Sequence, residues 1–231
     1  MKPKLHLIRG TMCNEKLWSK VASYLLEDFE LIYLDIPLDM DFDEIADSFK
    51  QIIQDQTINL IGFSLGGYIA TYFAAKFPQC IERLFVISNS PCELLSQELQ
   101  QRKQILNYVK RYSYNGMSRK KVASMLDEGN HTESLMDLII GMDSKLGKKT
   151  FISQYQNTFD RIDLAENIRA FEFYSCFYFS EDDSLVNQPW VSKLASCSPK
   201  TKVIKTSGSG HMLPLEKPLE FVEHIRRWMN Q

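Results

Sequence analysis

The stretch of sequence that decides the fold is INLIGFSLGGYIATYFAAKF, residues 58–77. Residues 58–63 form a short apolar run typical of a buried strand, and residues 65–77 have a strongly apolar helical pattern. Between them, residues 62–66 read Gly-x-Ser-x-Gly, and a glycine two positions either side of the serine leaves room for a sharp, strained turn. The pattern predicts that the Ser64 hydroxyl projects above a sheet edge at a helix N-terminus, where developing negative charge is favoured.

Short apolar runs alternate with helical patterns on both sides of this stretch. Strands are expected over residues 5–8, 31–34, 81–87, 171–179 and 203–205, and helices over residues 14–26, 43–54, 188–196 and 218–229. Continuous apolar strands separated by helices are typical of parallel sheets that are covered on both faces. The sequence therefore predicts an α/β fold with a mostly parallel sheet flanked by helices.

The region from residue 92 to residue 167 interrupts this alternation. It has helical periodicity and no convincing strand, and it is too long for an ordinary connection. We therefore expect a core made of residues 1–91 and 168–231, with residues 92–167 inserted as a helical lid. The lid is expected over the carboxyl edge of the sheet, where ligands bind in open parallel sheets.

A serine hydroxyl becomes a good nucleophile when a base takes its proton. Of the four histidines, His211 follows Gly-Ser-Gly at residues 208–210, directly after the strand expected near residue 205. That position places its imidazole on the same sheet edge as Ser64, whereas His6 is expected to be structural. His131 is expected at the surface or in contact with substrate, and His224 on the last helix.

A carboxylate must orient such a base and stabilise its protonated form. Residues 181–183, Glu-Asp-Asp, run off the end of a buried strand. We expect Asp183 to be this carboxylate, with Asp182 as the alternative. An oxyanion hole needs two backbone donors, and the candidates are the N–H groups of Leu65 and Thr11.

Together these residues resemble the α/β-hydrolase superfamily across nearly the whole chain. The matching segments are Leu7-Ile8-Arg9-Gly10, residues 62–67, residues 180–186, and Gly210-His211 followed by Glu216-Lys217-Pro218. The pattern is most similar to small lidded esterases such as the pimeloyl-carrier-protein methyl ester esterases, and the elimination enzyme of menaquinone synthesis shares the layout. The resemblance implies the α/β-hydrolase fold with a catalytic triad of Ser64, Asp183 and His211, and it favours Asp183 over Asp182.

The sequence departs from the family in three places. Arg9 stands where the family commonly has a histidine that supports the oxyanion loop, and the family's glycine loop is missing at residues 35–40. Ser180 replaces the usual glycine of the acid turn. The serine at the elbow argues against dehalogenases and epoxide hydrolases, which use a carboxylate there.

The function expected from these features is a serine esterase that cleaves a small carboxylic ester through an acyl-enzyme intermediate. A thioesterase or acyltransferase acting on acyl-CoA or acyl-carrier substrates is an alternative, as is C–C cleavage or elimination with the same three residues. A non-catalytic binder of small molecules with the same fold is the alternative from another class.

Composition sets further limits. A net charge of −2 does not suggest a nucleic-acid-binding surface, and no apolar run is long enough to span a membrane. No metal-ligand cluster or phosphate-binding loop suggests a metal or cofactor, and no secretory signal precedes the first strand, so a cytoplasmic location is expected. Five widely spaced cysteines without Cys-x-x-Cys indicate reduced thiols: Cys13, Cys80, Cys92, Cys176 and Cys197.

The first half of the expected lid is rich in basic residues. Seven Lys or Arg stand at positions 102, 103, 110, 111, 119, 120 and 121, against Glu93 and Glu98. This excess fits an acidic carrier protein or a coenzyme A phosphate, or simply a solvated face. An acyl-carrier protein is therefore a candidate partner.

Overall fold

The structure is a computed structural model that describes residues 2–194 and 198–231. Within these residues, a six-stranded sheet has the order β2-β1-β3-β4-β5-β6, and every pair of neighbours is parallel. Its strands are β1 (Lys4–Ile8), β2 (Glu30–Leu34), β3 (Ile58–Phe63), β4 (Ile81–Ile87), β5 (Tyr174–Ser180) and β6 (Thr201–Thr206). The predicted parallel sheet is thus confirmed.

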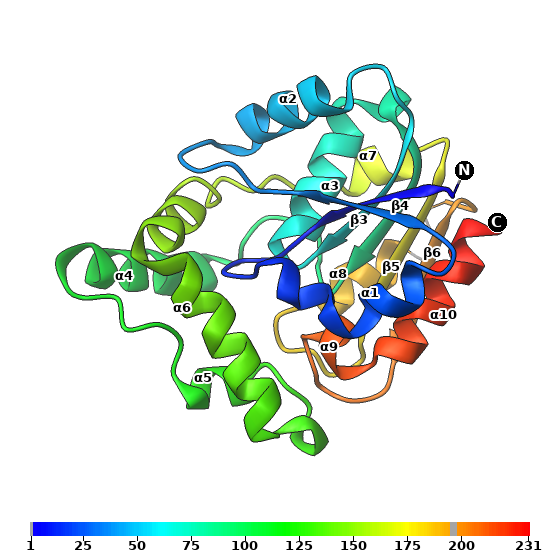
Figure 1. Ribbon diagram of the computed structural model, residues 1–231. Coiled ribbons are helices and arrows are strands. Elements are labelled where there is room, and N and C mark those ends of the chain that lie inside the picture. Colours follow the sequence, from blue (N-terminus) through cyan, green and yellow to red (C-terminus); the bar gives the residue numbers. More distant parts are fainter. Residues whose placement is uncertain (1, 195–197) are drawn as a thin grey trace.

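Helices cover both faces of the sheet (Figure 1). One face is covered by α2 (Phe42–Ile53), α3 (Leu65–Lys76), α7 (Ala165–Arg169) and α8 (Gln188–Leu194). The other face is covered by α1 (Ser19–Leu25), α9 (Leu213–Glu216) and α10 (Pro218–Met229). Short 3₁₀ turns lie at η1 (Glu15–Trp18), η2 (Pro78–Cys80) and η3 (Glu128–Asn130).

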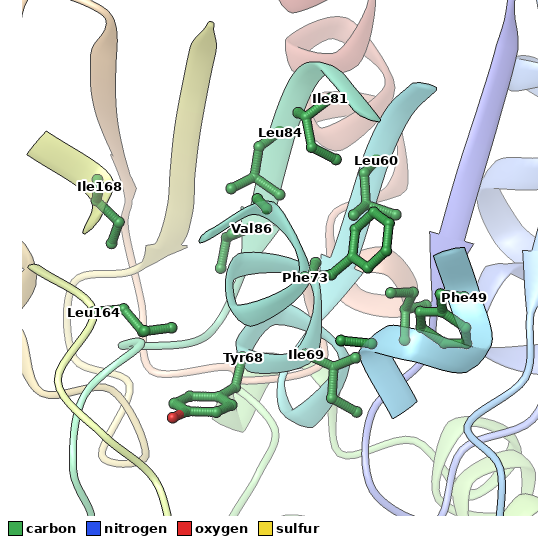
Figure 2. Close-up of a cluster of buried hydrophobic side chains, with 14 of the residues drawn as sticks. Phe49, Leu60, Tyr68, Ile69, Phe73, Ile81, Leu84, Val86, Leu164 and Ile168 are labelled. Carbon is green, nitrogen blue, oxygen red and sulfur yellow. The ribbon is translucent and has the colours of Figure 1, made fainter. Parts of the chain in front are cut away.

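Alternating side chains of the strands feed two hydrophobic clusters, one on each face. On β4, Leu84 and Val86 pack in the cluster around α3, while Phe85 and Ile87 pack in the cluster under α10. Figure 2 shows the first cluster, in which side chains from α2, β3 and β4 surround the helix that follows Ser64. Burial on both sides explains why residues 84–87 of β4 form a continuous apolar run.

The chain between β4 and β5 contains α4 (Ser96–Arg111), α5 (Arg119–Ala123) and α6 (Glu133–Gln156). In Figure 1 these three helices extend away from the sheet on one side. The last helix of this segment, α7, lies against the sheet: its Ile168, and Leu164 just before it, pack in the cluster around α3. Within α6, Gly147 has φ 70° and ψ −173°, so the helix is broken into two parts at that residue.

Several boundaries differ from the sequence-based expectation. The segment expected as one helix over residues 14–26 is the 3₁₀ turn η1 followed by α1. The expected strand over residues 171–179 begins at Tyr174, where pairing with β4 starts. Before it, Phe171 and Phe173 stack on each other with ring centroids 4.5 Å apart. Part of the expected helix over 188–196 lies outside the described residues.

Candidate active site

Ser64 stands at a sharp turn between β3 and α3. Its backbone has φ 51°, in the left-handed region that residues other than glycine rarely adopt. The flanking glycines are required by space: a Cβ at Gly62 would lie 2.2 Å from the carbonyl oxygen of Gly66, and one at Gly66 would lie 2.5 Å from that of Ile8. The turn therefore forms because both neighbours lack a side chain, and it leaves Ser64 at the N-cap of α3.

The structure brings Ser64, His211 and Asp183 together in one line of contacts. His211 Nε2 lies 3.0 Å from Ser64 Oγ, and His211 Nδ1 lies 2.8 Å from Asp183 Oδ2. An ionised carboxylate only accepts hydrogen bonds, so Nδ1–H donates to Asp183. In the neutral imidazole Nε2 is then the acceptor, and the Ser64 hydroxyl donates to it. This arrangement can move the hydroxyl proton onto the imidazole.

Asp183 reaches His211 because the chain turns tightly after β5. The Asp183 N–H donates to the Ser180 carbonyl, and Asp183 Oδ1 accepts from the Leu185 N–H at 2.9 Å. The carboxylate is buried, with 2% of Asp183 exposed, whereas Asp182 and Glu181 are exposed. Of the two aspartates considered from the sequence, the structure places Asp183 against the imidazole.

The backbone around His211 is held from two sides. The His211 N–H donates to the Met125 carbonyl at 2.8 Å, and the Ser88 hydroxyl donates to the His211 carbonyl at 2.8 Å. The Ser209 N–H donates to Asp127 Oδ2 at 3.0 Å. Sequence reasoning missed Met125 and Asp127, because neither stands in a local pattern that points to the histidine.

Glu216 connects the same two segments. Its carboxylate accepts from the Met212 N–H at 2.9 Å and from the Asp127 N–H at 2.7 Å. Burial raises the pKa of Glu216 above its usual value, while these hydrogen bonds work against the shift. Glu216 therefore stabilises the loop that carries His211. In the sequence it was noted only as part of a segment that resembles the family.

The two predicted oxyanion donors lie on neighbouring elements. The Leu65 N–H is in the first turn of α3, where helical N–H groups lack an intrahelical acceptor. Thr11 lies in the turn after β1 and lines the same cavity as Ser64. Their roles as donors remain predictions.

A cavity of about 510 Å³ opens at Ser64 and His211. The loop after β1 contributes Met12, and the chain between β4 and β5 contributes most of the remaining wall, largely apolar and aromatic: Ile105, Tyr108, Val109, Tyr114, Met117, Met125, Ile139, Phe151 and Tyr155. The same segment contributes the charged groups Glu98, Arg102, Lys121 and Asp143. Arg102 pairs with Glu98 at 2.8 Å, so this part of the wall carries partly balanced charge.

Asp143 is a fully buried carboxylate in the cavity wall. It accepts hydrogen bonds from the Tyr114 hydroxyl and from the Met117 N–H, the latter at 2.8 Å. Burial and the neighbouring Asp143 carboxylate raise the pKa of Tyr114. These contacts tie the loop before α5 to α6 and fix one wall of the cavity.

The other three histidines contact different groups. Burial lowers the pKa of His6 to about 4, which fits its place within β1 and the structural role expected for it. His131 Nε2 lies 3.0 Å from the Ala123 carbonyl, and His224 Nε2 lies 3.5 Å from Glu220. His211 is thus the histidine that the structure places beside Ser64.

Among the described residues, Cys13, Cys80, Cys92 and Cys176 are buried free thiols. Burial raises the pKa of Cys13, which lines the cavity, to about 12, so its thiol stays protonated at neutral pH. Cys197 lies outside the described residues. In the part of the chain that the structure describes, no helix is both long enough and apolar enough to cross a bilayer. The cytoplasmic location remains a prediction.

The chain is similar to known α/β hydrolases in sequence. Residues 37–124 match a family model described as the alpha/beta hydrolase fold. The pimeloyl-[acyl-carrier protein] methyl ester esterase of Aeromonas salmonicida is 27% identical over 42% of this chain, an alignment that spans 41% of that relative's length. The protein of the same name from Yersinia pseudotuberculosis is 23% identical over 96% of this chain and 91% of its own length.

Solved structures give the same fold. A thermophilic esterase from Thermogutta terrifontis superposes with a TM-score of 0.88 and 18% identity, covering 100% of this chain and 90% of that one. At that identity, the likeness establishes the fold alone. The comparisons confirm the fold class and the resemblance predicted from the sequence.

Proposed function

Because this chain has the α/β-hydrolase fold and resembles esterases of that fold, we propose that it is a serine hydrolase that cleaves a small carboxylic ester. The observation that carries the proposal is the line of contacts from Ser64 Oγ to His211 Nε2 at 3.0 Å and from His211 Nδ1 to Asp183 at 2.8 Å. Ser64 and His211 line a cavity large enough for a small acyl group.

In the proposed reaction, His211 Nε2 takes the Ser64 proton as Oγ forms a bond to the ester carbonyl carbon. The carbonyl oxygen becomes an oxyanion that the N–H groups of Leu65 and Thr11 stabilise. When the intermediate collapses, the bond to the alcohol oxygen breaks and the alcohol takes the proton from His211, which leaves an acyl-enzyme. Water, activated by the same imidazole, then releases the acid and restores Ser64.

The cavity wall indicates the class of acyl group. Its apolar and aromatic lining favours an acyl chain that is apolar along most of its length. The helices between β4 and β5 supply most of that lining, so we propose that residues 92–167 act as the lid and set acyl preference. The names of the relatives make a methyl ester carried on an acyl-carrier protein a candidate substrate, with that protein as candidate partner.

The test compares the unmodified protein with Ser64→Ala on p-nitrophenyl esters of graded acyl length. Loss of the nucleophile is expected to lower kcat by at least about 10³-fold. Ser184→Ala, a substitution at an exposed serine beside the acid turn, is the matched control and is expected to keep full activity. A fluorophosphonate probe should label the unmodified protein and leave Ser64→Ala unlabelled.

Each alternative has its own outcome in the same experiment. Faster turnover of acyl-CoA than of simple esters indicates a thioesterase or acyltransferase. Absence of both turnover and labelling in the unmodified, folded protein indicates a binder. Ester hydrolysis that persists in Ser64→Ala contradicts the proposed nucleophile.

A further inference from the structure

Strained backbone is concentrated at the carboxyl edge of the sheet. Among the described residues, the non-glycine residues with positive φ are Met12, Asp39, Gln54, Ser64 and Ser88. Met12, Asp39, Ser64 and Ser88 follow the ends of β1, β2, β3 and β4. Such conformations persist where surrounding contacts determine them, and they cluster at functional sites.

Two of these strained residues are held by adjacent residues of one helix. The Met12 N–H donates to Gln154 Oε1 at 2.9 Å, and the Asp39 N–H donates to Ser153 Oγ at 2.7 Å. Both acceptors lie in the part of α6 that follows the break at Gly147. Gln154 and Ser153 are themselves buried, so water competes poorly for these bonds.

The bond to Gln154 occupies one of the N–H groups of the turn after β1. The Cys13 N–H donates to the Gly10 carbonyl at 3.2 Å, and the Met12 N–H is taken by Gln154. Within the part of the chain that the structure describes, the Thr11 N–H has no hydrogen-bond acceptor. The turn thus leaves free the N–H group that it contributes to the proposed oxyanion hole.

The usual support of this turn is absent from the sequence. Where the resemblance implies a histidine, this chain has Arg9, and its guanidinium pairs with Asp35 and, at 3.5 Å, with Glu15. Both carboxylates are well exposed, so the guanidinium of Arg9 forms its ion pairs at the surface. Gln154 instead contacts the turn directly, from a position 142 residues away in the chain.

We infer that Gln154 is a positioning residue for the oxyanion hole: by holding the Met12 N–H, it keeps the turn in the conformation that presents the Thr11 N–H to the reacting carbonyl. This inference rests on the proposed serine-hydrolase function. It makes the rate of the chemical step depend on α6, in addition to any role of that helix in binding the acyl group.

Gln154→Met tests the inference, since it keeps the length of the side chain and removes the acceptor. Ser153→Ala is the matched control, because it removes the same kind of bond from the same helix to the other loop. For Gln154→Met, kcat with a p-nitrophenyl ester is expected to fall about 10-fold or more while KM stays within about twofold, as for loss of a transition-state contact. For Ser153→Ala, kcat should stay within about twofold of the unmodified protein.

A second readout isolates the oxyanion hole. Binding of a trifluoromethyl ketone, whose serine adduct carries an oxyanion, should weaken in Gln154→Met by about the factor lost in kcat and stay unchanged in Ser153→Ala. If Gln154→Met does not fold, Gln154→Asn, whose shorter side chain withdraws the acceptor, is measured in the same way. Circular dichroism melting checks that each compared variant is folded.

Equal loss of kcat in the two variants, or an unchanged kcat in Gln154→Met, overturns the inference. The proposed function is judged separately, by Ser64→Ala. If Ser64→Ala abolishes hydrolysis while Gln154→Met keeps its kcat, only the role of Gln154 is wrong. If Ser64→Ala still hydrolyses the ester, the proposed function itself is wrong.

Discussion

The two sides of the candidate site are held by different parts of the chain. Ser64 and Asp183 follow directly from β3 and β5, which flank β4 in the middle of the parallel sheet. Their positions are fixed by ladder hydrogen bonds and by turns of a few residues. The turns that carry Thr11 and His211 are held in addition by side chains and carbonyls from the segment between β4 and β5.

The difference separates two kinds of residue: those placed in the site directly by the sheet, and those that only hold a turn of the site in position. Groups placed by the sheet edge are expected to be indispensable for the chemistry, because no other segment can substitute for them. Groups that only hold a turn are expected to slow the reaction when changed, because the turn keeps its other contacts. Substitutions at Asp183, Asp127 and His6 test this ranking. Asp183 is placed by the sheet, Asp127 holds a turn, and His6 lies outside the site.

Asp183→Asn should give the largest effect of the three changes. An amide can donate to Nδ1 and so stabilise the tautomer in which Nε2 carries the proton, which cannot accept one from Ser64. We expect kcat for ester hydrolysis to fall by about 10³–10⁴-fold. Asp182→Asn, at the exposed neighbouring residue, should stay within about twofold, and the reverse ranking would assign the acid to Asp182.

Asp127→Ala should give an intermediate effect. It removes the carboxylate that accepts the Ser209 N–H, two residues before His211, while the bonds from Met125 and Ser88 remain. Loss of one such hydrogen bond corresponds to roughly a fivefold to tenfold change in kcat. Steady-state kinetics decide the result, with the exposed Glu128→Ala as control; a loss as large as that of Asp183→Asn would erase the distinction between the two kinds of residue.

His6→Gln should leave ester hydrolysis at neutral pH unchanged and alter only the pH dependence of stability. Burial lowers the pKa of His6 in the folded protein to about 4 from 6.5, so between these values the unfolded chain binds the proton more readily. The free energy of unfolding should therefore fall as pH drops from about 6.5 toward 4, by at most about 3 kcal/mol from this group.

Urea unfolding at pH 7 and at pH 4.5 measures this difference. The decrease between the two pH values should be smaller in His6→Gln than in the unmodified protein, while His131→Gln, at an exposed histidine, should behave like the unmodified protein. An equal decrease in all three would show that another group controls the acid sensitivity.

The sheet side of the site was predictable from the sequence because its signals are local. A strand, a Gly-x-Ser-x-Gly turn and a helix lie within residues 58–76, and the acid turn follows its strand directly. His211 needed one further step, the rule that parallel strands end at a common edge. The choice between Asp182 and Asp183 rested on the resemblance, and the structure now separates them by burial.

The supports were not predictable, because they join residues far apart in the chain. Gln154 meets Met12 across 142 positions, and Asp127 meets Ser209 across 82. A glutamine within a long helix carries no local sign that it will accept a backbone N–H of a distant turn. The shape of the cavity could not be predicted from the sequence either, because it depends on how the distant helices α4 and α6 pack.

The order of strands along the chain also bears on how the protein acquires its activity during synthesis. Strands β1 to β4 lie side by side and come from residues 4–87, so the turn that presents Ser64 can assemble early, whereas β5 joins only after the long crossover through α4, α5, α6 and α7. Closing so distant a pair is slow relative to local contacts. We expect a nascent chain to form the turn with the proposed nucleophile well before the proposed base and acid are in place, and hence to lack hydrolytic activity until the last third has folded.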